Sequence, residues 1–196
     1  RIQVRRIILL CFVLWPMSLH ADLNFNYGSG VAAKTDYAER SLITSMEKVG
    51  DRIYAVGVHG IIIFSDDSGN TWTQADYVPY QNTITDISCT SEKMCWATGH
   101  DATIIHSSDG GLNWVKQYED YDFDAPLLSI HMYDEKEGIA IGAFALSLRT
   151  SNGGESWDYL FLDDDDYQPH LNYVYGDNQA WRKSAKDEGY AVGEIG

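Results

Sequence analysis

The chain is poor in positive charge, and this shortage excludes the partners that basic proteins attract. Its 196 residues include 14 Lys and Arg against 29 Asp and Glu, which gives a formal net charge of −15 at pH 7. A field of this sign repels polyphosphates and anionic lipid headgroups. We therefore expect no nucleic-acid partner.

Long hydrophobic runs are also lacking, apart from a short one near the start. Arginines within the first six residues precede nine uninterrupted apolar residues, Ile7 to Trp15, and the small residue Ala21 follows. A membrane-spanning helix needs about 20 apolar residues, whereas a secretory signal combines a basic start, a short apolar run and a small residue at the cleavage site. Residues 1–21 are therefore predicted to be a removable signal peptide. The mature protein is then exported, periplasmic or secreted, without membrane insertion of its own.

Cysteine is scarce, with three in the chain. Cys11 falls in the predicted signal, which leaves Cys89 and Cys95. Because β-type residues alternate on either side of residues 90–93, the two sulfur atoms are expected to face each other across a hairpin. In an oxidising compartment a disulfide is favoured over two buried thiols. Two cysteines without a second pair nearby fall short of four zinc ligands, so we predict no metal site and no cofactor.

The sequence is rich in internal repetition. Three segments share the pattern Ser/Thr-x-Asp/Asn-x-Gly-x-Thr/Ser/Asn-Trp and end at Trp72, Trp114 and Trp157, which are 42 and 43 positions apart. An Ala-x-Gly landmark recurs in step with them, ending at Gly57, Gly99, Gly142 and Gly193. Each period contains four short β-type runs separated by turn residues. A four-stranded unit of about 40 to 45 residues is the size of a propeller blade.

The predicted fold class is therefore all-β, a β-propeller of four-stranded blades with Asp-box turns. A single blade has a face that it cannot bury, so blades must stack around an axis. The period indicates about 3.5 blades of an expected seven-bladed ring. Residues 22–41 are interpreted as an N-terminal segment, either a linker or a strand that closes the ring. The repeats predict an incomplete propeller over residues 42–196, with blades at about 42–80, 83–124, 127–165 and, without its outer strands, 170–196.

The residue types of the Asp box suit a tight turn. Its acid or amide accepts backbone N–H groups, its glycine adopts a positive φ, and its Ser or Thr caps the turn. Its tryptophan supplies apolar surface beneath the turn. We therefore interpret the boxes as structural fasteners between the third and fourth strands, rather than as catalytic or calcium-binding groups, and Asn152 in place of the acid fits this role. The box residues are Ser65, Asp67, Gly69, Thr71, Trp72, Ser107, Asp109, Gly111, Asn113, Trp114, Thr150, Asn152, Gly154, Ser156 and Trp157.

Asp boxes with Ala-Val-Gly strands at this period resemble the photosystem II assembly and stability factor family, which includes exported propellers. The stretch from Cys89 to Gly99, Cys-x5-Cys-Trp-Ala-Thr-Gly, also looks like that family. The resemblance spans about residues 41–196. In photosynthetic members it implies a chaperone-like scaffold that binds a membrane-protein precursor, partly through an arginine-rich patch, and this acidic chain shows no such patch. For this chain, the resemblance implies a protein-binding scaffold for some other envelope or membrane complex.

One face of the propeller is expected to carry the connections between blades and the tight loops 58–60, 100–102 and 143–145, with the Asp boxes on the other face. His59 and His100 occupy nearly equivalent positions in these loops. The connections mix carboxylates with tyrosines, which suits recognition of a basic or polar polypeptide, although simple solvation of acidic loops gives the same pattern. The candidate partner-binding residues are Tyr118, Asp120, Tyr121, Asp122, Asp124 and Tyr167.

A sialidase-like glycoside hydrolase is the alternative function, because sialidases also carry Asp boxes on propellers. Such a site needs an arginine cluster for a substrate carboxylate and a tyrosine nucleophile with an acidic partner. After the predicted signal, the arginines are Arg40, Arg52, Arg149 and Arg182, and no motif places three of them together. We therefore predict a binding module without catalytic residues.

Overall fold

A computed structural model describes residues 30–122 and 125–160, together with the backbone of residues 170–175 and 190–194. The predicted signal, Asp124 and Tyr167 lie outside the described residues. Within them the fold is all-β, as the repeats predict. No helix in this part of the chain is long and apolar enough to cross a membrane.

The first three repeats each form a four-stranded antiparallel sheet with its strands in chain order. The first sheet contains β1 (Ile43–Val49), β2 (Arg52–Gly57), β3 (Ile62–Ser65) and β4 (Thr73–Gln74). The second contains β5 (Ile84–Cys89), β6 (Cys95–Gly99), β7 (Ile104–Ser107) and β8 (Val115–Tyr118). The third contains β9 (Leu127–Met132), β10 (Gly138–Gly142), β11 (Ser147–Thr150) and β12 (Asp158–Tyr159). A further pair, β13 (His170–Tyr175) and β14 (Tyr190–Glu194), follows, and three 3-10 turns accompany the sheets, η1 (Ala38–Arg40), η2 (Val58–Gly60) and η3 (Ala143–Ala145).

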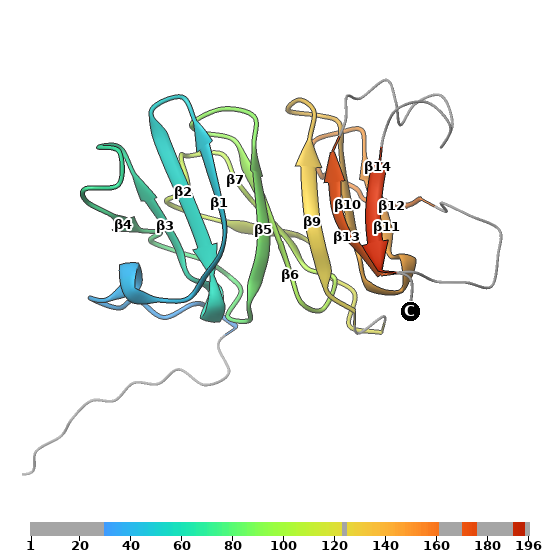
Figure 1. Cartoon of the computed structure of the whole chain (residues 1–196), viewed down its shortest axis with the longest axis horizontal. Helices are drawn as coiled ribbons and strands as arrows, with labels where there is room; N and C mark the ends of the chain where they lie inside the picture. The colour runs from blue at the N-terminus through green and yellow to red at the C-terminus, as the bar shows by residue number, and fades with distance from the viewer. Residues whose placement is uncertain (1–29, 123–124, 161–169, 176–189, 195–196) are drawn as a thin grey trace, which may run out of the picture.

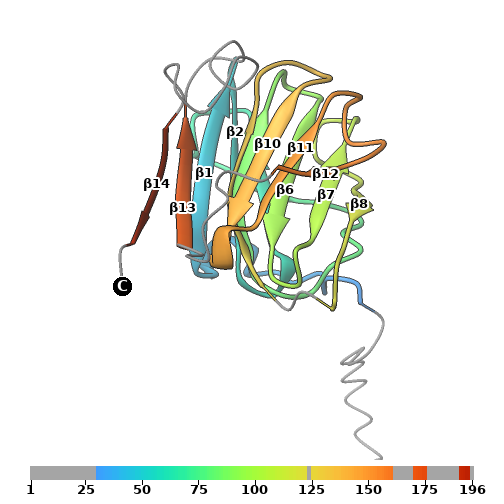
Figure 2. The ribbon, with the colours of Figure 1, turned by 90° about the vertical axis from the view of Figure 1, so that its right-hand side faces the viewer.

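The sheets stack face to face as propeller blades, with their first strands side by side (Figures 1 and 2). Buried aromatic and aliphatic side chains fill both spaces between the first three blades. Tyr54 and Ile62 of the first blade pack with Ile87 of the second, and Trp96 of the second packs with Ile130 of the third. Because burying such a side chain stabilises the fold by about 1.5–3 kcal/mol, these contacts between blades form the core. The predicted propeller fragment is confirmed.

The innermost strands are also joined by hydroxyl groups. The register of β1 shifts between Ile43 and Ser45, and that of β5 shifts at the equivalent place. Within these irregularities, Thr44 donates its hydroxyl to the carbonyl of Ile84 at 2.6 Å, and Thr85 donates to the carbonyl of Leu127 at 2.6 Å. Each threonine therefore connects its own blade to the next.

Asp86 on β5 joins three blades at once. One carboxylate oxygen accepts a hydrogen bond from Ser45 of the first blade at 2.7 Å. The other accepts from the Ser129 hydroxyl at 2.9 Å and from the Ile130 backbone N–H at 3.0 Å, both in the third blade. Charge-assisted hydrogen bonds of this kind are stronger than neutral ones, so Asp86 fixes the inner wall of the propeller.

Candidate functional site

The first Asp box is a closed set of hydrogen bonds between β3 and β4. The Ser65 hydroxyl accepts the Gly69 N–H at 2.8 Å and donates to Asp67 at 2.8 Å. Asp67 also accepts the backbone N–H of Thr71 at 2.8 Å and its hydroxyl at 2.6 Å. The Thr71 hydroxyl is the largest cause that lowers the pKa of Asp67 to about 2. Both carboxylate oxygens are thus used inside the turn.

The same bonds recur in the other two boxes, through Ser107, Asp109, Gly111 and Asn113 and through Thr150, Asn152, Gly154 and Ser156. Asn152 accepts the Ser156 N–H through its amide oxygen and donates its amide N–H to the Ser156 hydroxyl, both at 3.0 Å. An amide therefore meets the requirements of the turn as well as an acid does. Trp114 and Trp157 are buried beneath their boxes, and Trp72 is half-buried.

Arg52 joins the first blade to the Asp box of the second. Its guanidinium binds both oxygens of Asp66, at 2.6 and 2.7 Å, and donates to the carbonyl of Gly110 at 2.7 Å. It also lies 4.3 Å from the ring centre of Phe64. With its donors used in this way, Arg52 is occupied in holding the first two blades together.

The opposite face, which we call the connection face, carries a chain of polar contacts across the blades. Asn82 donates its side-chain amide to Asp101 at 2.9 Å. Asp101 lies in the turn between β6 and β7, and its backbone carbonyl accepts the N–H of Asp120 at 3.2 Å. The N–H of Ala102 donates to the carbonyl of Ala125 at 2.8 Å. The connection between the second and third blades is therefore held against this turn.

An acidic and aromatic cluster gathers at this point. The hydrogen bond with Glu119 is the largest cause that raises the pKa of Tyr121, and the charge of Asp101 raises it further. The Tyr121 side chain is 66% exposed. Asp122 is exposed as well and donates its backbone N–H to Asp120 at 3.1 Å. We call Asp101, Glu119, Asp120, Tyr121 and Asp122 the acidic cluster.

Tyr118 and Tyr159 extend the acidic cluster toward the third blade. Tyr118 donates its hydroxyl to that of Tyr159 at 3.4 Å, and Tyr159 donates to Asp120 at 2.7 Å. The structure thus brings four of the sequence-predicted residues together, whereas the two others lie outside the described residues. Sequence reasoning missed the contributions of Asn82 and Tyr159, because Asn82 lies in the connection before the second blade, Tyr159 lies in the third blade, and no local pattern marks either of them.

The Tyr159–Asp120 pair is also the tyrosine and acid combination that a sialidase requires, so its chemistry matters. An activated nucleophile needs a lowered pKa or an adjacent base. Here the pKa of Tyr159 is raised, first by the hydrogen bond with Tyr118 and then by burial and by Asp120. The raised pKa keeps Tyr159 a neutral phenol, and its hydrogen bond to Asp120 places a carboxylate beside the hydroxyl.

The tight turns of the connection face show why His59 and His100 are not equivalent. His59, Asp101 and Phe144 occupy the same position in three blades, with φ of 57°, 57° and 54°. The next residue in each turn also has a positive φ, which is the pattern of a type I′ hairpin turn. Each of these residues lies two positions after the repeated glycine, which is Gly57, Gly99 or Gly142. The position equivalent to His59 in the second blade is therefore Asp101, and not His100.

The inner wall contains one carboxyl group with an unusual environment. Burial raises the pKa of Glu47 to about 7, the backbone N–H of Cys89 opposes this shift, and the charge of Asp86 adds to it. Burial lowers the pKa of His131, and Asp86 opposes that shift. Among the described residues, no group of three or more His, Cys, Asp or Glu side chains is arranged to hold a metal ion.

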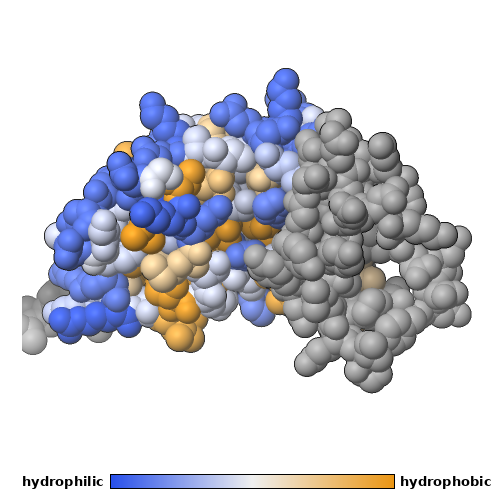
Figure 3. Space-filling model, turned by 45° about the horizontal axis from the view of Figure 1, so that its top comes forward, coloured by the Kyte–Doolittle hydropathy of each residue, from blue (hydrophilic) through white to orange (hydrophobic). Residues whose placement is uncertain are grey.

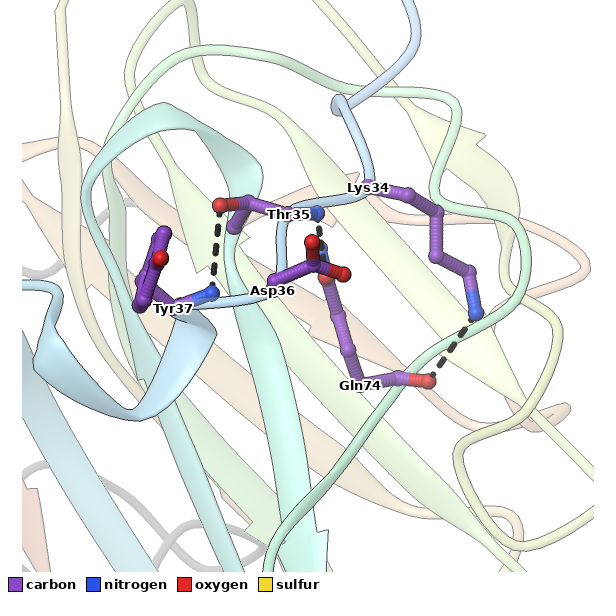
Figure 4. A pocket seen from close by; sticks show the side chains of 5 residues that line it. All are labelled: Lys34, Thr35, Asp36, Tyr37 and Gln74. Carbon is purple, nitrogen blue, oxygen red and sulfur yellow. Dashed lines mark hydrogen bonds between the residues drawn. The ribbon is translucent and has the colours of Figure 1, made fainter.

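A shallow cavity of about 490 Å³ lies where the N-terminal segment crosses the outer strand of the first blade (Figure 4). Lys34, Thr35, Asp36, Tyr37 and Gln74 line it. Thr35 donates its N–H to the Gln74 side chain at 3.0 Å, and Lys34 donates to the Gln74 carbonyl at 3.3 Å. These polar groups therefore bind one another, and the cavity marks a contact within the chain.

Comparison with known proteins identifies the family. The family model described as photosynthesis system II assembly factor YCF48 matches residues 74–180, which is more than half of the chain. The chain belongs to this family. A photosystem II assembly lipoprotein Ycf48 from Synechococcus sp. (strain CC9902) is 29% identical over 113 residues, covering 56% of the chain and 34% of the relative. The chain thus spans about a third of the length of this YCF48 protein.

Solved YCF48 structures share the fold. YCF48 bound to D1 peptide has a TM-score of 0.58 and 19% identity, over 68% of the chain and 44% of that structure. YCF48 from Cyanidioschyzon merolae has a TM-score of 0.54 and 19% identity, over 63% and 38%. A GH74 xyloglucanase from Xanthomonas campestris has a TM-score of 0.55 and 12% identity, over 70% and 26%. At these identities the likeness establishes the propeller architecture alone.

Proposed function

We propose that the chain is part of an exported, non-catalytic β-propeller that serves as an assembly scaffold for a protein complex of the envelope or membrane. Membership of the YCF48 family supports the scaffold role. The relative solved with a D1 peptide supports a polypeptide partner, and the lipoprotein relative supports a membrane-associated, exported protein. The signal-like residues 1–21 support a periplasmic or secreted location.

The observation that carries the proposal is the acidic cluster on the connection face. It presents the exposed ring of Tyr121 among several carboxylates, and Asp122 is exposed beside it. Aromatic rings beside charges of one sign form productive contacts with a side chain that combines apolar length and opposite charge. The partner we propose is therefore a polypeptide segment that carries Lys or Arg. Asp124 and Tyr167 remain proposed members of this surface.

Export also bears on the two cysteines, which we propose form a disulfide. The sulfur atoms of Cys89 and Cys95 lie 2.10 Å apart, across the ends of β5 and β6. Such a pair suits an oxidising compartment. Mass spectrometry of the exported protein, with and without reduction before alkylation, tests the assignment, and free thiols in the unreduced sample would reject it.

The test of the scaffold role uses the complete exported protein as bait on solubilised envelopes. The double variant Asp122→Lys and Asp124→Lys reverses charge on the connection face. The matched control, Glu135→Lys and Glu155→Lys, makes the same change in net charge with exposed residues outside the acidic cluster. We expect a membrane-complex protein that is retained by the wild type and the control and lost with the first variant. Equal retention by both variants would reject the acidic surface, and no retained partner would reject the scaffold.

A glycoside hydrolase is the second candidate, because GH74 enzymes share the fold. It predicts release of reducing sugar from xyloglucan, or of the fluorophore from a sialoside, by the complete protein. The engagement of Arg52 with Asp66 and with the carbonyl of Gly110 weighs against a sialidase-like site, which needs free arginines for its substrate carboxylate. We expect no release from either substrate, and turnover of one of them would replace the scaffold proposal.

A further inference from the structure

Asn152 of the third Asp box is followed by Gly153, and this pair is chemically distinctive. Asparagine is a thermolabile residue, because the backbone nitrogen of the next residue can attack its side-chain amide. Glycine has no side chain to hinder that attack, whereas every other asparagine in the chain precedes a larger residue. The pair of Asn152 and Gly153 is therefore the one in this sequence that is best suited to deamidation.

The reaction needs only water and hydroxide. The Gly153 backbone nitrogen loses its proton to hydroxide and forms a bond to the side-chain carbonyl carbon of Asn152. The bond from this carbon to the amide nitrogen breaks, and the nitrogen leaves as ammonia after taking a proton from water. Water then opens the resulting succinimide at either of its carbonyl carbons. The product is aspartate or, when the side-chain carbonyl carbon stays bonded to Gly153, isoaspartate.

The position of Asn152 is accessible to water. Its side chain is exposed, and hydrophilic residues line the rim of the Asp-box end of the blades (Figure 3). Burial therefore does not prevent the reaction. Protection in the assembled fold has to come from the hydrogen bonds that hold the two reacting groups.

The attacking group, the Gly153 nitrogen, is held by the third blade. Its N–H donates to the carbonyl of Lys136, in the turn between β9 and β10, at 2.9 Å. The N–H of Gly110, at the equivalent place in the second box, donates to the carbonyl of Lys93 at 3.2 Å. The contact is thus a repeated feature of the boxes, and it directs the Gly153 N–H toward Lys136.

The carbonyl of Gly153 is held by the second blade. It accepts the indole N–H of Trp96 at 3.2 Å and the side-chain amide of Gln117 at 2.9 Å. Trp96 is fully buried between the second and third blades. Gly153 therefore has hydrogen bonds to two blades, and it can move toward the Asn152 side chain only when these bonds open locally.

The group under attack, the Asn152 amide, is held inside the box. Its oxygen accepts the Thr150 hydroxyl at 2.9 Å and the Ser156 N–H at 3.0 Å. Its amide N–H donates to the Ser156 hydroxyl at 3.0 Å. Both the oxygen and the nitrogen of the amide are thus engaged, and the side chain is fixed within the turn while the box is closed.

We propose that Asn152 is a deamidation site that the docked second and third blades keep closed, and that opening of the third Asp box exposes. Aspartate at this position suits the box, as Asp67 and Asp109 do in the other two. Isoaspartate adds a methylene group to the backbone within the turn, so the box does not close around it. A molecule that reacts in this way while open keeps a permanent mark of having opened.

The protection is tested by incubating the complete protein at mildly alkaline pH, either folded or in denaturant. Mass spectrometry of the peptide that contains residue 152 measures its conversion, and chromatography separates aspartate from isoaspartate. We expect conversion in the folded protein to be slower by about tenfold or more. Asn70, which is exposed and precedes Thr71, should convert slowly in both states. Equal rates at residue 152 would overturn the protection, and no conversion in denaturant would overturn the site.

The hydroxyl of Thr150 offers a test within the box, because it binds both Asn152 and the Gly154 N–H. Thr150→Ala is expected to speed conversion in the folded protein. Thr150→Ser, which introduces the residue of the other two boxes, is expected to leave the wild-type rate. Circular dichroism establishes that each variant is folded during the incubation. A wild-type rate in folded Thr150→Ala would contradict the role of the box.

Trp96→Phe tests the second blade, and it decides the matter if Thr150→Ala does not fold. It keeps a ring in the core and removes the N–H donor to Gly153. Trp114→Phe is the matched control, because it removes the equivalent indole donor to Gly111 in the second box. We expect faster conversion of residue 152 with Trp96→Phe than with Trp114→Phe. Equal rates in the two folded variants would reject control by the docked second and third blades.

The effect of the product is tested by refolding protein that has been partly converted in denaturant and then treating it with a protease. Isoaspartate at residue 152 is expected to collect in the digested fraction. Asn152→Asp, in contrast, is expected to refold and to resist the protease as the wild type does. Isoaspartate at an equal level in the resistant fraction would show that the turn accommodates it, and would overturn the permanent mark.

Discussion

At the scale of single residues, the hydroxyl that begins each Asp box serves as donor and acceptor at once. The Ser107 side chain is buried, accepts the Gly111 N–H at 2.9 Å and donates to Asp109 at 3.0 Å. Glycine at position 111 has a φ of 82°, a conformation that other residues rarely adopt. The turn therefore depends on a hydroxyl and a glycine in fixed positions, which explains why both recur in every box.

Replacement of Ser107 by alanine is expected to lower the free energy of unfolding by about 1–3 kcal/mol, because the buried Gly111 N–H loses its acceptor. Chemical denaturation of the two proteins measures the difference. Ser108→Ala is the matched control at an exposed position and is expected to change stability little. If the two variants were equally stable, the hydroxyl of Ser107 would not hold the turn.

Glu47 makes stability depend on pH. Its pKa in the folded protein is about 7, raised mainly by burial, against 4.5 when unperturbed. Its contribution to stability is therefore fully present below about pH 4.5 and is lost as the pH rises to about 7. Glu47→Gln keeps an acceptor for the Cys89 N–H, so we expect about 1–2 kcal/mol higher stability above pH 7, after allowance for solvent screening. The measurement is the free energy of unfolding of both proteins across this pH range. If the variant lost stability as the wild type does, the raised pKa could not be assigned to Glu47.

At the scale of elements, the inner strands are positioned by side chains that reach across blade boundaries. The strands of one blade share a backbone hydrogen-bond ladder, whereas neighbouring blades meet mainly through side chains. Asp86 makes such contacts in both directions, since it holds Ser45 on one side and Ser129 on the other. In the sequence, Asp86 is only an acid within a predicted strand. Its contacts with two other blades become visible once the blades are stacked in the structure.

Asp86→Ala is expected to lower the free energy of unfolding by about 2–4 kcal/mol, because it leaves two hydroxyls and the Ile130 N–H without their acceptor. Asp86→Asn should cost much less, since an amide has an oxygen for the third blade and an N–H for Ser45. Thermal or chemical unfolding of both variants provides the comparison. Equal losses would mean that the charge, rather than the hydrogen-bond geometry, is what matters.

The hairpin between β5 and β6 is where the proposed disulfide acts. Closing a loop of this short length between Cys89 and Cys95 restricts the unfolded chain by about 2 kcal/mol. Cys89→Ser combined with Cys95→Ser is therefore expected to lower the unfolding midpoint and to abolish its sensitivity to a reducing agent. A wild-type midpoint that does not respond to reduction would reject this contribution.

At the scale of the whole molecule, an excess of acidic residues directs the choice of partner. The net charge of −15 favours basic ligands at long range, and salt screens this attraction because the Debye length falls from about 10 Å at 0.1 M to 3 Å at 1 M. Affinity for an oligolysine peptide is expected to fall about tenfold over that range. Calorimetry or fluorescence titration measures it. Affinity that does not change with salt would indicate an apolar contact instead.

The sequence predicts the fold well because one period governs both turn chemistry and strand pattern. Trp72, Trp114 and Trp157 mark the blades, and counting from them places the strands within a few residues. The candidate site is predicted only in part. Tyr118, Asp120, Tyr121 and Asp122 are close together in the chain, but Asn82 reaches the same place from the connection before the second blade and Tyr159 from the third blade. Convergence across blades depends on stacking, which a local pattern does not encode.

The contacts of the inner wall have a consequence for synthesis on the ribosome. Thr44, Thr85 and Asp86 all belong to an earlier blade than the backbone groups of Ile84, Leu127 and Ile130 that they bind. As the chain emerges, each finished blade already presents the side chains that the next strand needs. At both boundaries among the first three blades, the earlier blade thus carries side chains that can position the first strand of the blade made after it.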